Sequence, residues 1–333
     1  MSANITENDK QQGLVKAWHG LTEVLPVIEI DNNWLTQWDV VPNTLSIVKP
    51  DGEKLDTKFK ILTATDNGMV IGRPYAATYT PITNKTFLSL VQQVLDETEG
   101  AKIESIGSVC DRNRVFASIS IKDAKTYSIG ARTFNDYLNF GNSYDGTSAL
   151  WVCNTNVCTV CNNTFTYNMG RTDADGINAL GARITHSGNV DVKLTNIKGI
   201  ITGYLKNQQI FRDKFSKLDK MEISGKVAYN IFKAWSAYCS NGNITENTKL
   251  RTSKLNSLFH TGRGNSGKTR ADLFSAVTDY YTHMSLVRSP SDTRQYVSSE
   301  FGTGAQKKRE FWRIVNNDAE VEKWAKMGEL IAA

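Results

Sequence analysis

The stretch AKIESIGSVCDRNRVFASISIKDAKTYSIG, residues 101–130, decides the fold class. From Val115 to Ile121 every second side chain is apolar and aliphatic, and this period of two is typical of a β-strand with one buried face. Polar turns at Asp111–Arg114 and Lys122–Lys125 separate the strands. Short alternating strands joined by tight turns predict an antiparallel β-meander.

Helical patterns flank this region on both sides. Thr83 is a suitable N-cap for KTFLSLVQQVLDETE, residues 85–99, in which apolar side chains recur every three or four positions. After Ile177 the expected helices span residues 192–221, 225–238, 269–287 and a tail from residue 307. The fold class is therefore predicted to be α+β, with an antiparallel β-meander packed with helices and a helical C-terminal part.

Composition sets the expected domain organisation. A chain of 333 residues with 40% hydrophobic and 22% charged residues is an ordinary globular protein. We expect a flexible N-terminus at residues 1–14, a single α+β domain at 15–285 that is β-rich to about residue 165 and helical after it, and a helical tail at 286–333. No apolar run has the length of a membrane span, and the first residues lack a signal-peptide pattern, so we expect a cytoplasmic protein without a membrane partner.

Charge is distributed unevenly along the chain. Residues 1–100 carry 8 Lys and Arg against 13 Asp and Glu, residues 101–313 carry 29 against 17, and residues 314–333 carry 2 against 4. A basic middle between two acidic ends favours a polyanionic partner, of which nucleic acid is the simplest.

Residues 262–269, GRGNSGKT, match the phosphate-binding P-loop pattern and precede a predicted helix. A P-loop follows a buried strand, whereas TKLRTSKLNSLFH, residues 248–260, is polar and basic. No apolar strand ending in Asp follows that would hold magnesium. We therefore expect no ATP hydrolysis, although a basic turn can still meet backbone phosphates through Arg263, Lys268 and Arg270.

Cysteine spacing suggests one metal site. Cys153, Cys158 and Cys161 have the spacing of a plant-type iron–sulfur loop, for which Cys110 or Cys239 would be the fourth ligand, and zinc is an alternative. Against both, these residues lie in an apparent strand, where positions 153 and 161 face one way and 158 the other. We therefore expect structural cysteines and no cofactor. No HExxH, GxSxG or other catalytic set is found, which favours a binding protein over an enzyme.

Several short motifs together resemble a family of phage- and plasmid-borne proteins that share a domain of unknown function. In chain order they are Trp18-His19-Gly20-Leu21, YTPITNKTF at 79–87, Ser143-Tyr144-Asp145-Gly146, VCNNT at 160–164, His186-Ser187 in place of a usual His-Thr, and AVTDYYTH at 276–283. The resemblance spans about residues 15–285 and implies a location in the cytoplasm of a bacterial host. In this family the glycine-rich turn before the last motif usually lacks the P-loop lysine.

The order helix, β-meander, long helix is also similar to the core of phage single-strand annealing proteins, which form rings or filaments and bind single strands without ATP. This likeness implies a DNA-binding protein for single-stranded DNA, active in annealing and DNA recombination as a homo-oligomer. Its strand path would be lined by Arg112, Arg114, Lys122, Lys125, Arg132, Arg171 and Arg183. Aromatic side chains that would stack on bases are Phe116, Tyr127 and Phe134.

Two other functions stay open at this point. One is a protein-binding module that inhibits a host factor or defence system, with the basic face meeting an acidic protein. The other is an enzyme, either a P-loop ATPase or a metal-dependent nuclease. Salt-dependent binding to oligonucleotides separates the first hypothesis from the module, and ATP turnover or loss of activity on chelation identifies the enzyme.

Overall fold

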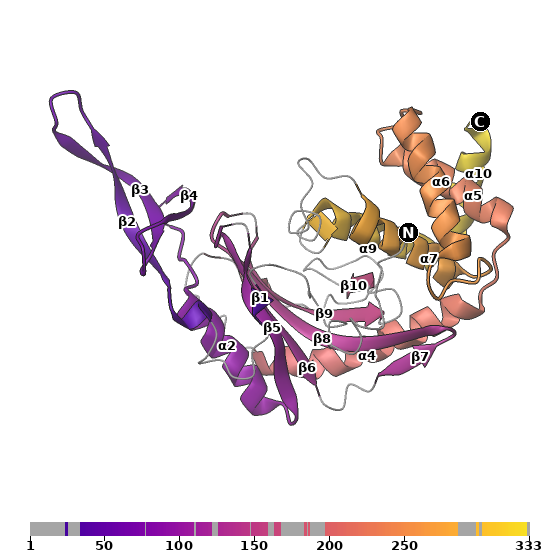
Figure 1. Cartoon of the computed structure of the whole chain (residues 1–333), viewed down its shortest axis with the longest axis horizontal. Helices are drawn as coiled ribbons and strands as arrows, with labels where there is room; N and C mark the ends of the chain where they lie inside the picture. The colour runs from indigo at the N-terminus through magenta and orange to yellow at the C-terminus, as the bar shows by residue number, and fades with distance from the viewer. Residues whose placement is uncertain are drawn as a thin grey trace.

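The computed structural model describes residues 24–25, 34–76, 78–109, 111–121, 126–146, 148–158, 163–167, 183–184, 186, 197–285, 298–299 and 302–331. Two antiparallel sheets and a set of helices form an α+β fold whose C-terminal part is helical, which confirms the predicted class. Figure 1 shows a crescent in which a narrow sheet projects at one end and a group of helices forms the other.

The larger sheet is the predicted β-meander. Its strand order is β1 (Val24–Leu25), β5 (Ala101–Val109), β6 (Arg114–Ile121), β8 (Arg132–Ser143), β9 (Leu150–Cys158) and β10 (Asn163–Tyr167), all antiparallel. Two short strands join it at the side, since β7 (Tyr127–Ile129) pairs with β8 and β11 (Arg183–Ile184) pairs with β9. The predicted turn at residues 111–114 connects β5 to β6, and both Asp111 and Arg112 have positive φ there.

Helix α2 (Asn84–Glu97) covers part of one face of this sheet. It begins at Thr83, whose hydroxyl accepts a hydrogen bond from the Thr86 amide, as an N-cap does. Phe87 and Val91 of the helix are fully buried in one cluster with the aliphatic residues of β6. The apolar face of β6 and the apolar face of α2 therefore pack together in one core.

The smaller sheet forms an arm. It consists of β2 (Val40–Val48), β3 (Lys54–Ala64) and β4 (Val70–Ala76), and β3 lies in the middle. The 3-10 turn η2 (Trp34–Thr36) and the arm's base join the cluster around α2 through Leu35, Leu62 and Ile71. Beyond this base the β2–β3 hairpin extends away from the body (Figure 1).

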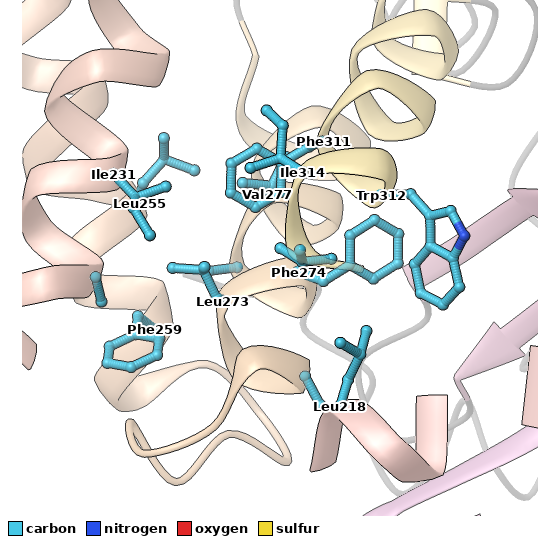
Figure 2. Packing of buried hydrophobic residues seen from close by; sticks show 14 of the residues in the cluster. Leu218, Ile231, Leu255, Phe259, Leu273, Phe274, Val277, Phe311, Trp312 and Ile314 are labelled. Carbon is cyan, nitrogen blue, oxygen red and sulfur yellow. The ribbon is translucent and has the colours of Figure 1, made fainter. Parts of the chain in front are cut away.

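The helical part follows the sheet. It contains α4 (Ile197–Lys220), α5 (Gly225–Tyr238), α6 (Glu246–Thr261), α7 (Arg270–Asp279), the π-helix η3 (Tyr280–Met284), α9 (Thr303–Val315) and α10 (Asp318–Leu330). Figure 2 shows their common core, in which Phe274 of α7 and Trp312 of α9 pack together. Phe134 of β8 packs edge-on against Phe211 and Phe215 of α4, so the sheet and the helices share this core.

Helix α6 is absent from the sequence-based prediction. Two of its five buried positions are threonines, so the apolar period is weak; the five are Thr248, Thr252, Leu255, Leu258 and Phe259. Thr245 and Thr248 instead start the helix with a reciprocal capping box. Within the described residues, no helix has both the length and the apolar character that a bilayer crossing requires.

Candidate nucleic-acid interface

Two of the predicted DNA contacts, Arg112 and Arg114, are neutralised within the chain. Arg112 forms an ion pair with Asp66 at 2.8 Å, and its guanidinium lies 4.8 Å from the centre of the Trp38 ring. The hydrogen bond from Arg112 lowers the pKa of Asp66. Arg114 pairs with Asp145 at 3.4 Å. Because each arginine already has a carboxylate partner, neither adds a full positive charge to a strand path.

The prediction for Arg132 is wrong, because this side chain is only 1% exposed. Its guanidinium donates to Asp219 at 2.9 Å, to Asn265 at 2.9 Å and to Asp272. A buried cation needs such partners, since its desolvation is costly. Arg132 therefore joins strand β8 to helices α4 and α7 and is unavailable to a ligand.

The proposed base-stacking residues are also mainly core residues. Phe116 is 1% exposed and Phe134 is 0% exposed, because both faces of the sheet are covered at these positions. Tyr127 is half-buried, stacks on Phe134 at 5.3 Å and donates to Asp136 at 3.1 Å. The expectation of base stacking is therefore wrong for Phe116 and Phe134, and Tyr127 is held in the fold rather than presented to a strand.

The other predicted contacts are spread over several places. Lys122, Lys125 and Arg171 lie outside the described residues, and so does the side chain of Arg183. Arg270 forms an ion pair with Asp318 at 2.6 Å. Arg263 and Lys268 are exposed on the glycine-rich turn. The structure therefore does not bring the predicted residues together into one groove.

The P-loop-like turn, residues 262–269, follows helix α6 instead of a strand. Its concave side is filled by the carboxylate of Asp272, which stands at the third position of α7. One carboxylate oxygen accepts from the amides of Lys268 and Thr269 at 2.9 and 3.0 Å and from the Ser266 hydroxyl at 2.7 Å. Backbone amides at a helix N-terminus are what a P-loop offers to phosphate, and here the chain's own anion occupies them.

Electrostatics keep this carboxylate ionised. Burial acts to raise the pKa of Asp272, but the Lys268 amide, the Ser266 hydroxyl and the charge of Arg132 outweigh it, and the net shift is downward. The other carboxylate oxygen is bound to Arg132. A phosphate at this turn would have to displace a buried, paired anion.

The structure describes only part of the predicted cysteine site. Strand β9 contains Cys153 and Cys158, but their side chains, together with Cys110 and Cys161, lie outside the described residues. Cys239 caps the C-terminal end of α5, and burial raises the pKa of its thiol, whereas a metal ligand must be a thiolate. No group of three or more metal-binding side chains occurs in the described part of the chain.

Three of the family-like motifs converge at one end of the large sheet. The Tyr79 hydroxyl hydrogen bonds to the His186 ring and contacts the carbonyl of Ser143 at 3.4 Å. Tyr144 donates to Asn84 at 2.6 Å. Burial lowers the pKa of His186 to about 4, so its ring is neutral at physiological pH. These contacts fasten the arm's base to the sheet.

A different region gathers positive charge around an open space. A pocket of about 360 Å³ lies between α5, α6, the π-helix η3 and α9. Arg251, Lys254 and Lys307 line it, and none of its described lining residues is Asp or Glu. Pockets of this size accept small ligands, and a cationic lining selects anionic ones.

Two of the cations come from one face of α6. Arg251 and Lys254 are three positions apart and therefore neighbours on the helix surface. Arg251 is anchored by its Nη1, which donates to the carbonyl of Ser236 at 3.1 Å and to the Ser240 hydroxyl at 3.3 Å. Its Nε is buried and has no hydrogen-bond partner within the described part of the chain. The guanidinium is therefore fixed in the wall of the pocket by its bonds to Ser236 and Ser240.

Lys307 enters the pocket from α9. Its ammonium group pairs with Glu310 at 2.7 Å and lies 4.4 Å from the centre of the Tyr238 ring, which is 47% exposed. Burial acts to lower the pKa of Lys307, but Glu310 raises it, and the net shift is upward. The cation is therefore present at physiological pH, where Glu310 partly neutralises it and the Tyr238 ring lies under it.

The π-helix forms another wall of the pocket. Its single wide turn, Tyr280–Met284, continues α7, and such turns often mark functional sites. Tyr281 and the Cys239 sulfur share a hydrogen bond of 3.3 Å, and burial raises the pKa of both groups, so both are neutral at physiological pH. The pocket offers cations and neutral polar groups, which suits a phosphate group.

The sequence-based prediction does not include this pocket. The polar and basic stretch at 248–260, which argues against a P-loop strand, is the helix that supplies Arg251 and Lys254. Lys307 lies about fifty residues further along. The spacing of three between the two α6 cations makes them neighbours only if the segment is a helix, and no helix was predicted there.

The chain belongs to the family defined by a domain of unknown function, DUF932, whose model matches residues 75–300. This confirms the resemblance at the level of that domain, and the matched range includes Tyr79, residues 143–146 and the motif at 276–283. The family description names no activity, ligand or source. No curated protein and no solved structure matches the chain.

Proposed function

We propose that this protein binds single-stranded nucleic acid without ATP, and that the cationic pocket holds a backbone phosphate of the strand. The observation that carries the proposal is the convergence of Arg251, Lys254 and Lys307 on a pocket whose described lining has no carboxylate. The sequence-based hypothesis of nucleic-acid binding is thus kept, but its contact surface moves from the β-meander to the helical part.

The surroundings of the pocket support a polyanion rather than a single small anion. Residues 197–285 carry 14 Lys and Arg against 6 Asp and Glu. An excess of this kind attracts a chain of phosphates, and the release of condensed counterions makes such binding salt-dependent. The exposed part of the Tyr238 ring, which is 47% exposed and lies under Lys307, adds an aromatic contact for an unpaired base.

The finer parts of the proposal follow from the resemblance stated above. We assign the protein to a phage or plasmid, place it in the cytoplasm of the bacterial host, and give it a role in single-strand annealing during DNA recombination as a homo-oligomer. Support for ATP independence comes from Asp272, because its carboxylate occupies the amides that a nucleotide phosphate would need.

Fluorescence anisotropy with a labelled single-stranded oligonucleotide tests the proposal. We expect binding that weakens by one to three orders of magnitude between about 50 and 200 mM salt, if roughly four to six phosphates are contacted per protomer. A double-stranded oligonucleotide and an RNA of the same sequence compare the classes of strand. A folded protein that binds none of these at the lowest salt concentration would sink the proposal and favour the protein-binding alternative.

A further inference from the structure

The charge that lines the cationic pocket matches a phosphate group with two negative charges. Of its three cations, Lys307 is paired with Glu310 at 2.7 Å, whereas Arg251 and Lys254 form no ion pair within the described part of the chain. A phosphate diester inside a strand carries one negative charge. A phosphate monoester at a strand end carries nearly two at physiological pH, because its second pKa is about 6. The monoester therefore neutralises both unpaired cations, and the diester only one.

The first turn of α9 adds positive potential to the same wall. Thr303 and Gly304 line the pocket, and no side chain caps this end of the helix. The amides of Thr303, Gly304 and Ala305 make no hydrogen bond within the described part of the chain. Gly304 and Ala305 are buried, so bulk water has little access to their amides. Amides at a helix N-terminus favour an anion as their partner, and here they lie beside the two unpaired cations.

The arrangement of these groups around one small space favours a single phosphate. The pocket of about 360 Å³ is bounded by α5, α6, η3 and α9, and its cations come from α6 and α9. A site that follows a strand instead spreads its cations along a groove beside successive phosphates. Arg251 is partly buried, and a lower dielectric strengthens its attraction to each negative charge of the ligand. The pocket should therefore discriminate between one charge and two.

We propose that the pocket binds the terminal phosphate monoester of a nucleic-acid strand in preference to the phosphates inside the strand. This inference rests on the proposed function, since it specifies which phosphate of the strand the pocket holds. The internal phosphates then lie along the basic helical surface outside the pocket. Binding of the terminal group would direct the protein to the ends of single strands.

Fluorescence anisotropy with matched oligonucleotides tests the preference. The strands share one sequence and carry the fluorophore on an internal base, so that both ends are free. They differ only in having a 5′-phosphate, a 3′-phosphate or hydroxyl groups at both ends. At fixed salt and about pH 7.5 we expect the strand with the recognised terminal phosphate to bind about tenfold more tightly than the hydroxyl-ended strand. Comparison of the 5′ and 3′ phosphates shows which end is recognised.

The ionisation of the ligand provides a second measurement. Lowering the pH from about 7.5 to about 5.5 converts most of the monoester from a dianion into a monoanion. The preference should then fall to about threefold or less, while the affinity for the hydroxyl-ended strand changes little. Arg251 stays charged in this range, and burial raises the pKa of the Cys239 thiol and the Tyr281 hydroxyl. The pKa of Lys307 is raised despite its burial, because Glu310 stabilises the cation.

Two lysines of helix α6 provide a matched pair of variants. Lys254→Ala removes an unpaired cation of the pocket, whereas Lys249→Ala removes an exposed lysine that does not line it. We expect Lys254→Ala to lower the preference for the phosphorylated end by about threefold or more. The Lys249→Ala variant should keep the wild-type preference. Circular dichroism checks that both variants are folded.

A second pair of variants addresses the start of α9. Thr303→Pro removes the amide at the first position of the helix, where proline is tolerated, and Thr303→Ala keeps that amide. Both variants lack the threonine side chain, so the difference between them measures the amide. We expect a lower preference for the phosphorylated end in the proline variant than in the alanine variant.

The outcomes separate this inference from the proposed function. Equal affinity for all three strands would overturn the terminal-phosphate inference and leave single-strand binding intact. A preference that Lys249→Ala lowers as much as Lys254→Ala does would place the terminal phosphate outside the pocket. Displacement of the phosphorylated strand by an equimolar deoxynucleoside monophosphate would identify a free nucleotide as the ligand and overturn the role of the strand end. A folded protein that binds none of the strands at the lowest salt concentration would overturn both proposals.

Discussion

The P-loop-like turn at residues 262–269 and the cationic pocket beside it show two ways in which a chain can use positive charge. Both lie along helix α6, the turn at its end and the pocket along its side. The turn has the sequence of a phosphate site, but Asp272 already fills it. The pocket has no recognisable motif, yet three cations surround space without a described carboxylate in the lining. Whether an anion binds depends on which group already satisfies the donors.

The largest effect is expected from removing the anion in the turn. Asp272→Ala leaves Arg132 with one fewer carboxylate in a buried position and should lower the free energy of unfolding by about 3–5 kcal/mol. Denaturant unfolding measures the change. Asp318→Ala is a control, because its ion pair with Arg270 is at the surface and should contribute at most about 1 kcal/mol. Equal losses in the two variants would contradict the assignment of Asp272 as the buried anchor.

The pH dependence of the free energy of unfolding reports on His186, which lies outside both regions. Because the folded pKa of His186 is about 4, below its unfolded value of 6.5, the unfolded state binds more protons between these values. Stability should be full above about pH 6.5 and should fall by up to about 3 kcal/mol as the pH drops toward 4.

His186→Asn removes this titration and should flatten the stability profile in that window. The lowered pKa of Asp272 places its own contribution at lower pH, since it is present above the ordinary value of 3.8 and is lost as the pH falls through the folded pKa. A profile of the Asn variant that still falls steeply between pH 6.5 and 4 would show that another group titrates there.

A moderate effect is expected in the pocket. Arg251→Ala with Lys254→Ala, two pocket cations without a carboxylate partner in the described part of the chain, should weaken binding to single-stranded DNA by about tenfold and lower the slope of log affinity against log salt by about 1.4, or 0.7 for each phosphate that is no longer neutralised. Because Arg112 and Arg114 are ion-paired, Arg112→Ala with Arg114→Ala is the matched control and should change the slope less. A larger decrease of the slope in the control than in the pocket variant would indicate that the strand binds at the β-meander.

No effect is expected from the lysine of the P-loop-like turn. Lys268→Ala should leave both oligonucleotide affinity and phosphate release from ATP at wild-type levels, because the amides of this turn are held by Asp272. A malachite-green phosphate assay checks the second point. Phosphate release well above background that this substitution abolishes would identify an ATPase.

The sequence predicted the elements of the fold better than their surroundings. The alternation in β6 and the Thr83 cap of α2 are local signals, and the structure confirms both. The same local pattern could not show that Phe116 and Phe134 are covered on the second face, because residues far away in the chain cover them. The alternation along a strand therefore did not determine the solvent exposure of the side chains on its second face.

The candidate site was harder to predict for a related reason. Charge along the chain correctly indicated a basic middle, but each arginine's net contribution depends on its neighbour in space. Arg112, Arg114 and Arg132 all find carboxylates that are distant in sequence, whereas Lys254 finds none within the described part of the chain. Summed charge therefore shows that the middle of the chain is basic, and only the fold shows which cations have no carboxylate partner.

The buried Arg132 has a consequence for the order in which the protein matures on the ribosome. Its partner Asp219 lies 87 residues later in the chain, and Asp272 lies 140 residues later. While only the β-meander has been synthesised, this cation has neither carboxylate partner, and burying it is unfavourable. The Arg132 end of strand β8 should therefore become buried only after α7 has left the exit tunnel. Folding of the early-synthesised sheet then depends on helices that are synthesised later.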